Sequence, residues 1–280
     1  MKVLPFVIPK PDNSTLIVQE DRAENFYSKL HQHEEIQLSF ILKGEGTFFI
    51  GDAFGQFAPG DFFAIGAHLP HVFSNEPSPE GVHMISLFFT PESYGPGFFE
   101  HPEFHSLGPF FDAVKQGFRI HVDERSIADR MPEMMRLSPL KRFLTFIEIL
   151  HLLSDSTKEM LSSDIHRKKF SEAEGKRMRD IMDYTLENYS QNLSVSEAAE
   201  IANMSPNAFC RYFRQRTNKT YMSFVTDIRI GQACRLLTRN RDLRVSEIAF
   251  RSGFNNLTHF NRKFRQVKGM TPSGFRERLK

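Results

Sequence analysis

The sequence predicts an α+β protein of two domains: a β-rich N-terminal domain followed by a pair of helices, and an all-α C-terminal domain. Three observations indicate this division. Short apolar or alternating runs, separated by turns rich in Gly and Pro, fill the first part of the chain. Helical spacing of apolar residues replaces them near residue 123, and a helical pattern is repeated near the C-terminus.

Changes in composition and charge divide the chain into four segments. We expect the β-rich domain over residues 1–122, a helical segment over 123–153, a linker over 154–174 and the all-α domain over 175–280. From Ala173 onward there are 20 Lys or Arg and 10 Asp or Glu residues, whereas the remainder has 16 and 24. A basic C-terminal part beside an acidic remainder predicts a polyanionic partner for the C-terminal domain.

Cysteine usage and the N-terminal residues exclude several protein classes. Two cysteines are too few for a disulfide framework and have no metal-type spacing. Pro5 and Pro9 interrupt the first apolar run, which therefore does not resemble a signal peptide. The longest apolar stretches are far short of a membrane span. We expect a cytoplasmic protein without a membrane partner.

The β-rich domain is predicted from regularly spaced short strands. The expected strands are Ile36–Leu42, Thr47–Ile50, Asp61–Ile65 and His83–Phe89. Turn signals such as Gly44-Glu45-Gly46 and Pro59-Gly60-Asp61 separate them. Strands of this length and spacing predict a sandwich or a barrel.

The segment 123–153 is predicted to contain two helices, the second of which starts at Pro139 after a Ser138 cap. The second helix carries an apolar stripe of Leu140, Phe143, Leu144, Ile147, Leu150 and Leu153. This stripe is wider than packing on a small domain requires, so the sequence predicts that its first five members form a homodimer contact. Complete burial against its own domain is the alternative.

The repeat near the C-terminus predicts two helix-turn-helix units. Leu193–Ala199 matches Leu243–Ala249 at an offset of 50, and Phe209–Gln215 matches Phe260–Gln266 at an offset of 51. One extra residue therefore lies in the turn of the second copy.

The residues around each turn are those that such a motif requires. In the first copy, Ser194 and Glu197 form a potential capping box, Asn203 tolerates a left-handed turn, and Ser205 can cap the next helix. In the second copy, Gly253 occupies the turn and Asn255 or Asn256 can cap the next helix, whereas Arg244 replaces the first serine.

Polar and basic side chains lie opposite the apolar stripe of each second helix. The predicted base-reading residues are Asn207 and Arg211 in the first unit and Thr258, Asn261 and Arg262 in the second. Arg can pair with guanine and Asn with adenine in the major groove. The predicted phosphate contacts, nearer the helix ends, are Arg214, Arg216, Lys219, Arg265 and Lys268. For any one of these residues, a solvated helix surface is the alternative.

The segment Ile248–Phe254, the Phe260-x3-Phe264-Arg265 spacing and Gly269-Met270-Thr271-Pro272 resemble the AraC/XylS family of bacterial regulators. The resemblance extends from Met178 to Arg278. It implies two helix-turn-helix units joined by one long helix, here Met222 to Leu237, with both recognition helices in successive major grooves of double-stranded DNA. It also admits RNA polymerase as a partner.

The N-terminal domain is similar to the cupin sensor domain that many members of this family carry. His31-x-His33 with Gly44-Glu45-Gly46 resembles the first cupin motif, and Pro59-Gly60-Asp61 with Pro70-His71 resembles the second. Metal-dependent cupins have a Glu where this chain has Gln37, a poor ligand for a divalent ion. We therefore expect His31, His33, Gln37 and His71 to bind a small-molecule effector by hydrogen bonds, with no metal or other cofactor. The alternative is that these histidines only form hydrogen bonds within the protein at the mouth of a barrel and bind no effector.

These observations predict a sequence-specific DNA-binding transcription regulator that is not an enzyme, in which a cupin-like β-barrel with a helical pair precedes an all-α domain. One alternative is a cupin metalloenzyme of the oxygenase or isomerase type fused to a DNA-binding module. A second alternative is a constitutive regulator whose cupin domain only dimerises.

Overall fold

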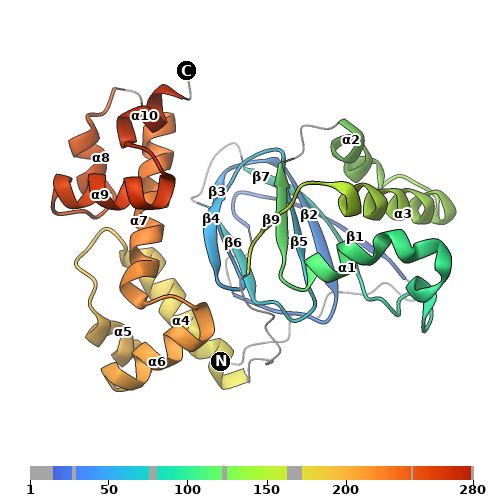
Figure 1. The fold of residues 1–280 in the computed structure, drawn as a ribbon, viewed down its shortest axis with the longest axis horizontal. Coiled ribbons are helices and arrows are strands. Elements are labelled where there is room, and N and C mark those ends of the chain that lie inside the picture. Colours follow the sequence, from blue (N-terminus) through green and yellow to red (C-terminus); the bar gives the residue numbers. More distant parts are fainter. Residues whose placement is uncertain are drawn as a thin grey trace. The chain divides into compact units, whose positions relative to one another are not determined.

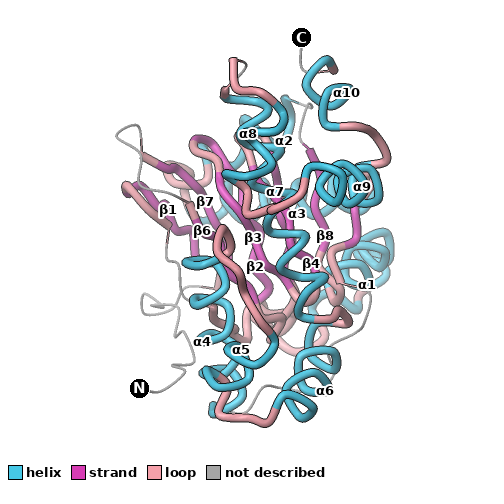
Figure 2. The backbone as a smooth tube through the Cα atoms, turned by 90° about the vertical axis from the view of Figure 1, so that its left-hand side faces the viewer, coloured by secondary structure: helices cyan, strands magenta, loops and turns pink. Residues whose placement is uncertain are grey.

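The computed structural model describes residues 15–26, 30–75, 81–121, 125–162, 172–240 and 242–278. The chain divides into two compact units, Lys2–Glu172 and Ala173–Lys280. The described strands all belong to the first unit, and the second is built from helices (Figure 2). Within the described ranges, none of the helices is both long and apolar enough to span a bilayer.

Two antiparallel sheets form the first unit, with strand orders β1-β7-β2-β5-β8-β9 and β4-β3-β6. The strands are β1 (Ile17–Ala23), β2 (Ile36–Lys43), β3 (Gly46–Ile50), β4 (Ala53–Phe57), β5 (Asp61–Ile65), β6 (His71–Ser74), β7 (Val82–Phe89), β8 (Phe118–His121) and β9 (Glu159–Met160). The four strands expected from the sequence are confirmed as β2, β3, β5 and β7. The other five were not expected.

The sheets enclose a core rich in phenylalanine, which includes Phe48, Phe57, Phe63 and Phe73. We expected a sandwich or a cupin-like barrel. The described strands pair as two separate sheets, and closure into a barrel is not seen among them. An isolated bridge between His31 and His71 lies outside the strand ladders. The chain leaves the larger sheet after β2 at Gly44, whose φ of 94° is accessible to glycine.

Helices cover the opposite face of the larger sheet (Figure 1). They are η1 (Phe98–Glu100), η2 (Pro102–Leu107), α1 (Gly108–Val114), α2 (Arg125–Glu133) and α3 (Pro139–Asp155). Alternate residues of β7, Ile85, Leu87 and Phe89, share a core with Phe146 and Ile149 of α3. The expected helix from Pro139 to Leu153 is confirmed as α3, which continues for two more residues.

The first residues of the expected linker, 154–174, pack on the first unit. Ser154 is buried in α3, and β9 pairs with β8 through Phe118 and Arg119. The apolar side chain of Leu161 is buried as well, and its amide donates to the carbonyl of Gly117 at 2.9 Å. Residues up to 162 therefore contribute to the first unit, while 163–171 lie outside the described residues.

In the second unit, one long helix runs between two helix pairs (Figure 1). The helices are α4 (Glu172–Asn188), α5 (Val195–Ile201), α6 (Pro206–Thr217), α7 (Tyr221–Arg239), α8 (Val245–Arg251), α9 (Leu257–Lys268) and α10 (Pro272–Glu277). The expected long connector is confirmed as α7. It contacts α6 from the first pair and α8, α9 and α10 around the second.

The local signals around both turns are confirmed. Ser194 and Glu197 form both bonds of a capping box at the start of α5, and the Ser205 hydroxyl accepts from the amide of Ala208 at the start of α6. Asn203 has a φ of 52°. In the second copy Asn256, rather than Asn255, caps α9, and Arg244 provides no side-chain cap for α8.

Gly253, in the turn between α8 and α9, combines a left-handed backbone with a close approach to a neighbour. Its φ is 87°, and a Cβ atom there would lie 2.5 Å from the carbonyl oxygen of Tyr189 and 2.9 Å from Arg229 Nε. Arg229 of α7 donates to the carbonyls of Tyr189 and Gln191, both at 2.7 Å. This turn therefore packs directly on the segment that follows α4.

Gly253→Ala should destabilise the second unit more than Gly269→Ala, which is its matched control. Both glycines have positive φ, so both substitutions introduce strain of about 1–2 kcal/mol. A Cβ at Gly269 meets nothing within 4 Å, whereas the Gly253 contact should add roughly 1–3 kcal/mol. Urea unfolding of the full chain, followed by hydrogen exchange of the α8 and α9 amides, measures the difference. Equal losses for the two variants would contradict the packing role of Gly253.

Candidate functional site

The outer face of α6 presents the polar residues predicted from the first repeat. Asn207 and Arg211 are exposed, one helical turn apart. Phe209 and Phe213 on the opposite side are fully buried, and both rings contact Tyr221 of α7. The buried aromatics thus fix the rotation of α6, and its polar face is directed to solvent.

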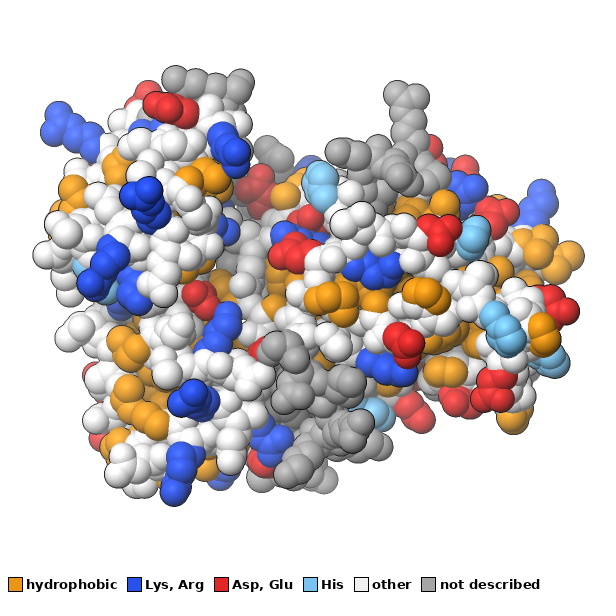
Figure 3. Space-filling view, in the orientation of Figure 1, with side chains coloured by type: hydrophobic (Ala, Val, Ile, Leu, Met, Phe, Trp, Pro, Cys, Tyr) orange, Lys and Arg blue, Asp and Glu red, His pale blue; other side chains and the backbone are white. Residues whose placement is uncertain are grey.

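The outer face of α9 has the same construction. Phe260 and Phe264 are fully buried, whereas Thr258, Asn261 and Arg262 are exposed. Arg262 lines two open depressions, one shared with Thr258 and His259 and the other with Asn261, Arg265 and Gln266. Lys and Arg side chains are scattered over the face of the helical unit visible in Figure 3.

The predicted phosphate contacts fall into two groups. Arg214, Arg265 and Lys268 are exposed. Arg216 instead forms an ion pair with Glu174 of α4, and Lys219 pairs with Asp227 of α7 at 2.8 Å. These two cations therefore stabilise the unit itself, and a phosphate would have to compete with their carboxylates.

Three histidines converge in the first unit, as the two cupin-like motifs suggested. His33 and His71 are buried, His31 is partly exposed, and their ring nitrogens lie within 4.8 Å of one another. Backbone bonds between His31 and His71, at 2.9 and 3.1 Å, hold the two segments together. The cluster is thus positioned by the start of β6 and by the chain before β2.

Hydrogen bonds determine where His33 and His71 carry their protons. Nδ1 of His33 lies 2.9 Å from the Glu35 carbonyl, and Nδ1 of His71 lies 2.8 Å from the Leu69 carbonyl. A carbonyl only accepts, so each neutral ring is protonated at Nδ1 and has a lone pair on Nε2. Burial lowers the pKa of His33 and lowers that of His71 well below its usual value, which favours these neutral forms.

Gln37 satisfies both lone pairs. Its side-chain oxygen Oε1 lies 3.0 Å from Nε2 of His33 and 3.0 Å from Nε2 of His71, and its Nε2 donates to the Ser39 hydroxyl at 2.8 Å. An amide oxygen cannot donate to a ring lone pair, so with both rings protonated at Nδ1 the amide turns by 180° and directs its NH₂ group to the two Nε2 atoms. In that turned orientation the amide oxygen accepts from the Ser39 hydroxyl, which is bonded in turn to the Ser86 hydroxyl. The bonds among His33, His71, Gln37 and Ser39 are then satisfied by neutral groups, and the buried carboxylate of Glu35 lies 3.6 Å from Nδ1 of His33.

The three imidazoles could also hold a borderline divalent ion. Imidazole nitrogen suits zinc, copper, nickel or iron, and a bond from the opposite ring nitrogen to a carbonyl orients a metal-bound histidine. Among the described residues, the group that could hold an ion contains no carboxylate. Gln37 Oε1, which lies 3.0 Å from Nε2 of both His33 and His71, would add one neutral oxygen to such a ligand set.

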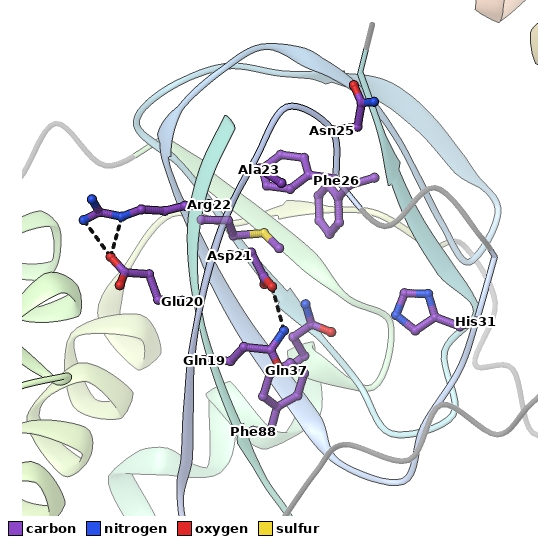
Figure 4. A pocket seen from close by; sticks show the side chains of 12 residues that line it. Gln19, Glu20, Asp21, Arg22, Ala23, Asn25, Phe26, His31, Gln37 and Phe88 are labelled. Atoms are coloured by element: carbon purple, nitrogen blue, oxygen red, sulfur yellow. Dashed lines mark hydrogen bonds and ion pairs between the residues drawn. The ribbon is translucent and has the colours of Figure 1, made fainter. Parts of the chain in front are cut away.

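A cavity of about 220 Å³ lies beside this cluster, against the inner side of β1 and β7 (Figure 4). Two of the four predicted pocket residues, His31 and Gln37, line it, whereas His33 and His71 do not. Sequence reasoning missed β1, which contributes Gln19 and Asp21 to the wall. The remaining lining residues are Glu20, Arg22, Ala23, Asn25, Phe26, Phe73, Met84 and Phe88.

Acidification should destabilise the first unit. The folded-state pKa values of His33 and His71 lie below the usual 6.5, so the unfolded chain takes up protons that the folded chain does not. The free energy of unfolding is therefore highest above pH 6.5 and falls as the pH drops toward the folded pKa values. The slope is on the order of 1.4 kcal/mol per pH unit for each histidine.

Urea unfolding between pH 7.5 and 5 measures this slope. His71→Asn should flatten it, and the exposed His101→Asn should leave it unchanged. A slope that was the same in all three proteins would exclude these rings as its source.

Comparison with known proteins assigns both units. Residues 198–278 match the helix-turn-helix domain model HTH_18, and residues 20–88 match the cupin domain model. The chain is 24% identical over 262 residues to the uncharacterized HTH-type transcriptional regulator YdeC of Bacillus subtilis (strain 168), covering 90% of this chain and 87% of that protein. Four other relatives match over 89 to 119 residues, and the chain spans 24% to 38% of their length.

One further relative and one solved structure match part of this chain. The chain is 30% identical over 117 residues to the XylDLEGF operon transcriptional activator 2 of Pseudomonas putida, which is 41% of this chain and 74% of that protein. A crystal structure of the DNA-binding domain of AdpA with a target DNA is 31% identical, with a TM-score of 0.33, over 35% of this chain and 86% of that one. From these matches, the chain belongs to the AraC/XylS family of transcriptional regulators, with a cupin domain in its N-terminal unit and a helical AraC-type DNA-binding domain in its C-terminal unit.

Proposed function

We propose that α6 and α9 are the recognition helices of two helix-turn-helix units and read the bases of one operator half-site. The observation that carries this proposal is their common construction. Each follows a turn with a left-handed residue, buries two phenylalanines on one side and exposes Asn, Arg or Thr on the other. Those exposed side chains are the ones that pair with base edges in the major groove.

The length of α7 supports simultaneous binding by both helices. Its 19 residues correspond to about 28 Å of α-helix. Successive major grooves on one side of DNA lie roughly 34 Å apart. Because the two helix pairs pack near opposite ends of α7, their separation suits adjacent grooves. Arg214, Arg265 and Lys268 would bind phosphates beside them.

Substitution of base-reading and phosphate-binding residues should have different consequences. Arg211→Ala and Arg262→Ala should each cost roughly 1–3 kcal/mol of binding energy and relax the preference at particular base pairs. Lys268→Ala should weaken all sequences by a similar factor and reduce the salt dependence. Selection of operators from a random DNA pool, followed by titration of single-base variants, tests this. A uniform loss in all three variants would refute the assignment of base-reading roles.

We further propose that α3 forms a homodimer contact. Leu140 and Leu144 near its start are 68% and 52% exposed, and Phe143 and Ile147 beside them are partly buried. Leu150, also predicted in this contact, is fully buried in the core of its own unit and is not available to a partner. The contact would therefore use the N-terminal half of α3.

Leu144→Glu should convert a dimer into soluble monomers, because a charge would be buried in the contact. Met160→Glu is the control, since Met160 is exposed on β9 outside α3. Sedimentation at micromolar concentration measures the mass of each protein. If the wild type sediments as a monomer, α3 is not a dimer contact.

The cupin unit is proposed to bind a small organic effector that alters DNA binding, and RNA polymerase is a proposed partner at promoters. The cavity beside Gln37 supports the first of these roles. The alternative of a metal-dependent enzyme in the cupin unit is favoured by the three converging histidines. Metal analysis of the purified protein separates the two, because the enzyme requires a stoichiometric ion and the hydrogen-bonded effector site does not.

A further inference from the structure

Among the described residues that line the cavity beside β1, Asp21 directs its carboxylate inward. Side chains of a strand alternate between its faces, so Gln19 and Asp21 point into the cavity, whereas Glu20 and Arg22 also line it but direct their side chains to the other face of β1 (Figure 4). The strand register places Gln19 opposite Ser86 and Asp21 opposite Met84 on β7. Asp21 therefore belongs to the same polar wall as the Gln37 network.

Asp21 has no cationic partner among the residues that the structure describes. Its carboxylate accepts one hydrogen bond, from the Gln19 amide at 2.8 Å. Glu20, one residue away, is bonded to Arg22 at 2.7 Å and to His83 at 2.9 Å. Burial raises the pKa of Asp21, because partial removal from water disfavours the charged carboxylate. A group that donates to Asp21 would offset this effect.

The remaining walls suit a ligand with several donors and an apolar surface. Gln19 and Asn25 can each donate and accept, whereas the Gln37 amide is already bonded to His33, His71 and Ser39. Phe26, Phe73 and Phe88 provide aromatic walls, which contact C–H groups and also attract cations to the faces of their rings. At about 220 Å³, the cavity is smaller than those that hold drug-sized molecules, which begin near 300 Å³.

We propose that this cavity binds a small non-anionic molecule that presents hydroxyl or ammonium donors to Asp21, and that Asp21 excludes carboxylates and phosphates. The inference rests on the proposed effector control and specifies the chemistry of its ligand. Both donor groups complement a carboxylate, whereas a second anion beside the partly buried Asp21 would be repelled by it. Imidazole and amide groups alone could bind either hydroxylated or carboxylated molecules. With Asp21 in the wall, hydroxylated molecules fit the cavity and carboxylated molecules do not.

The test uses the full-length protein and a bacterial metabolite extract divided by anion exchange. The flow-through holds neutral and cationic molecules, and the retained fraction holds anions. We expect the flow-through, and not the retained fraction, to raise the melting temperature and to change operator affinity. Passage of the active flow-through over a cation exchanger then separates ammonium ligands from hydroxylated ones.

Asp21→Asn keeps the shape of the side chain and removes its charge. Because hydrogen bonds to charged groups are stronger than neutral ones, this variant should lower the affinity for the active fraction about tenfold or more. Asp112→Asn, an exposed carboxylate on α1, should leave that affinity unchanged. Asp21→Ser provides a second variant if Asp21→Asn does not fold.

The outcomes separate failure of this inference from failure of effector control. Activity in the retained fraction, or unchanged affinity in both Asp21 variants, would overturn the assignment to Asp21 and leave effector control intact. If neither fraction has any effect on stability or DNA binding, effector control itself is refuted, and this inference with it.

Discussion

The geometry of the DNA-binding unit depends on the contact between the α8–α9 turn and the segment after α4. Gly253 allows the turn to touch the Tyr189 carbonyl, and Arg229 binds the carbonyls of Tyr189 and Gln191 from α7. The guanidinium also lies over the Phe254 ring, 6.0 Å from its centre. Three segments that are distant in sequence meet at this point. The position of α9 relative to α4 and α7 is fixed there by backbone contacts, which tolerate little displacement.

Local signals made the second unit predictable. The capping box at Ser194, the cap at Ser205 and the left-handed turns at Asn203 and Gly253 each act over a few residues, so a single sequence contains them in full. The ion pairs of Arg216 with Glu174 and of Lys219 with Asp227 were not predictable in the same way. They join residues 42 and 8 positions apart, and only the packed helices determine that they meet.

In the first unit, the mostly apolar strands were predicted from the sequence, whereas the polar strand β1 was not. β2, β5 and β7 are mostly apolar because both of their faces are covered, with Gln37, Ser39 and Ser86 as inward polar exceptions. β1 has Gln19 and Asp21 at inward positions, so polar and apolar residues do not alternate along it. Neither the strand nor its place in the cavity wall was therefore predicted. The histidine cluster was predicted from motif spacing. That Gln37 contacts both His33 and His71, and that neither ring lines the cavity, follows from three-dimensional distances.

Strand β7 connects the two sites proposed for the first unit. Its inner face carries Met84 and Phe88 in the cavity wall and Ser86 in the Gln37 network. Its outer face carries Ile85, Leu87 and Phe89, which share a core with α3. Packed cores transmit small displacements, so a ligand that moves β7 would also move the helix on its other face. A ligand could then change dimerisation only by the difference between its affinities for the two arrangements of α3. Because β7 lines the cavity with one face and packs against α3 with the other, a ligand in the cavity could have different affinities for the two arrangements of α3.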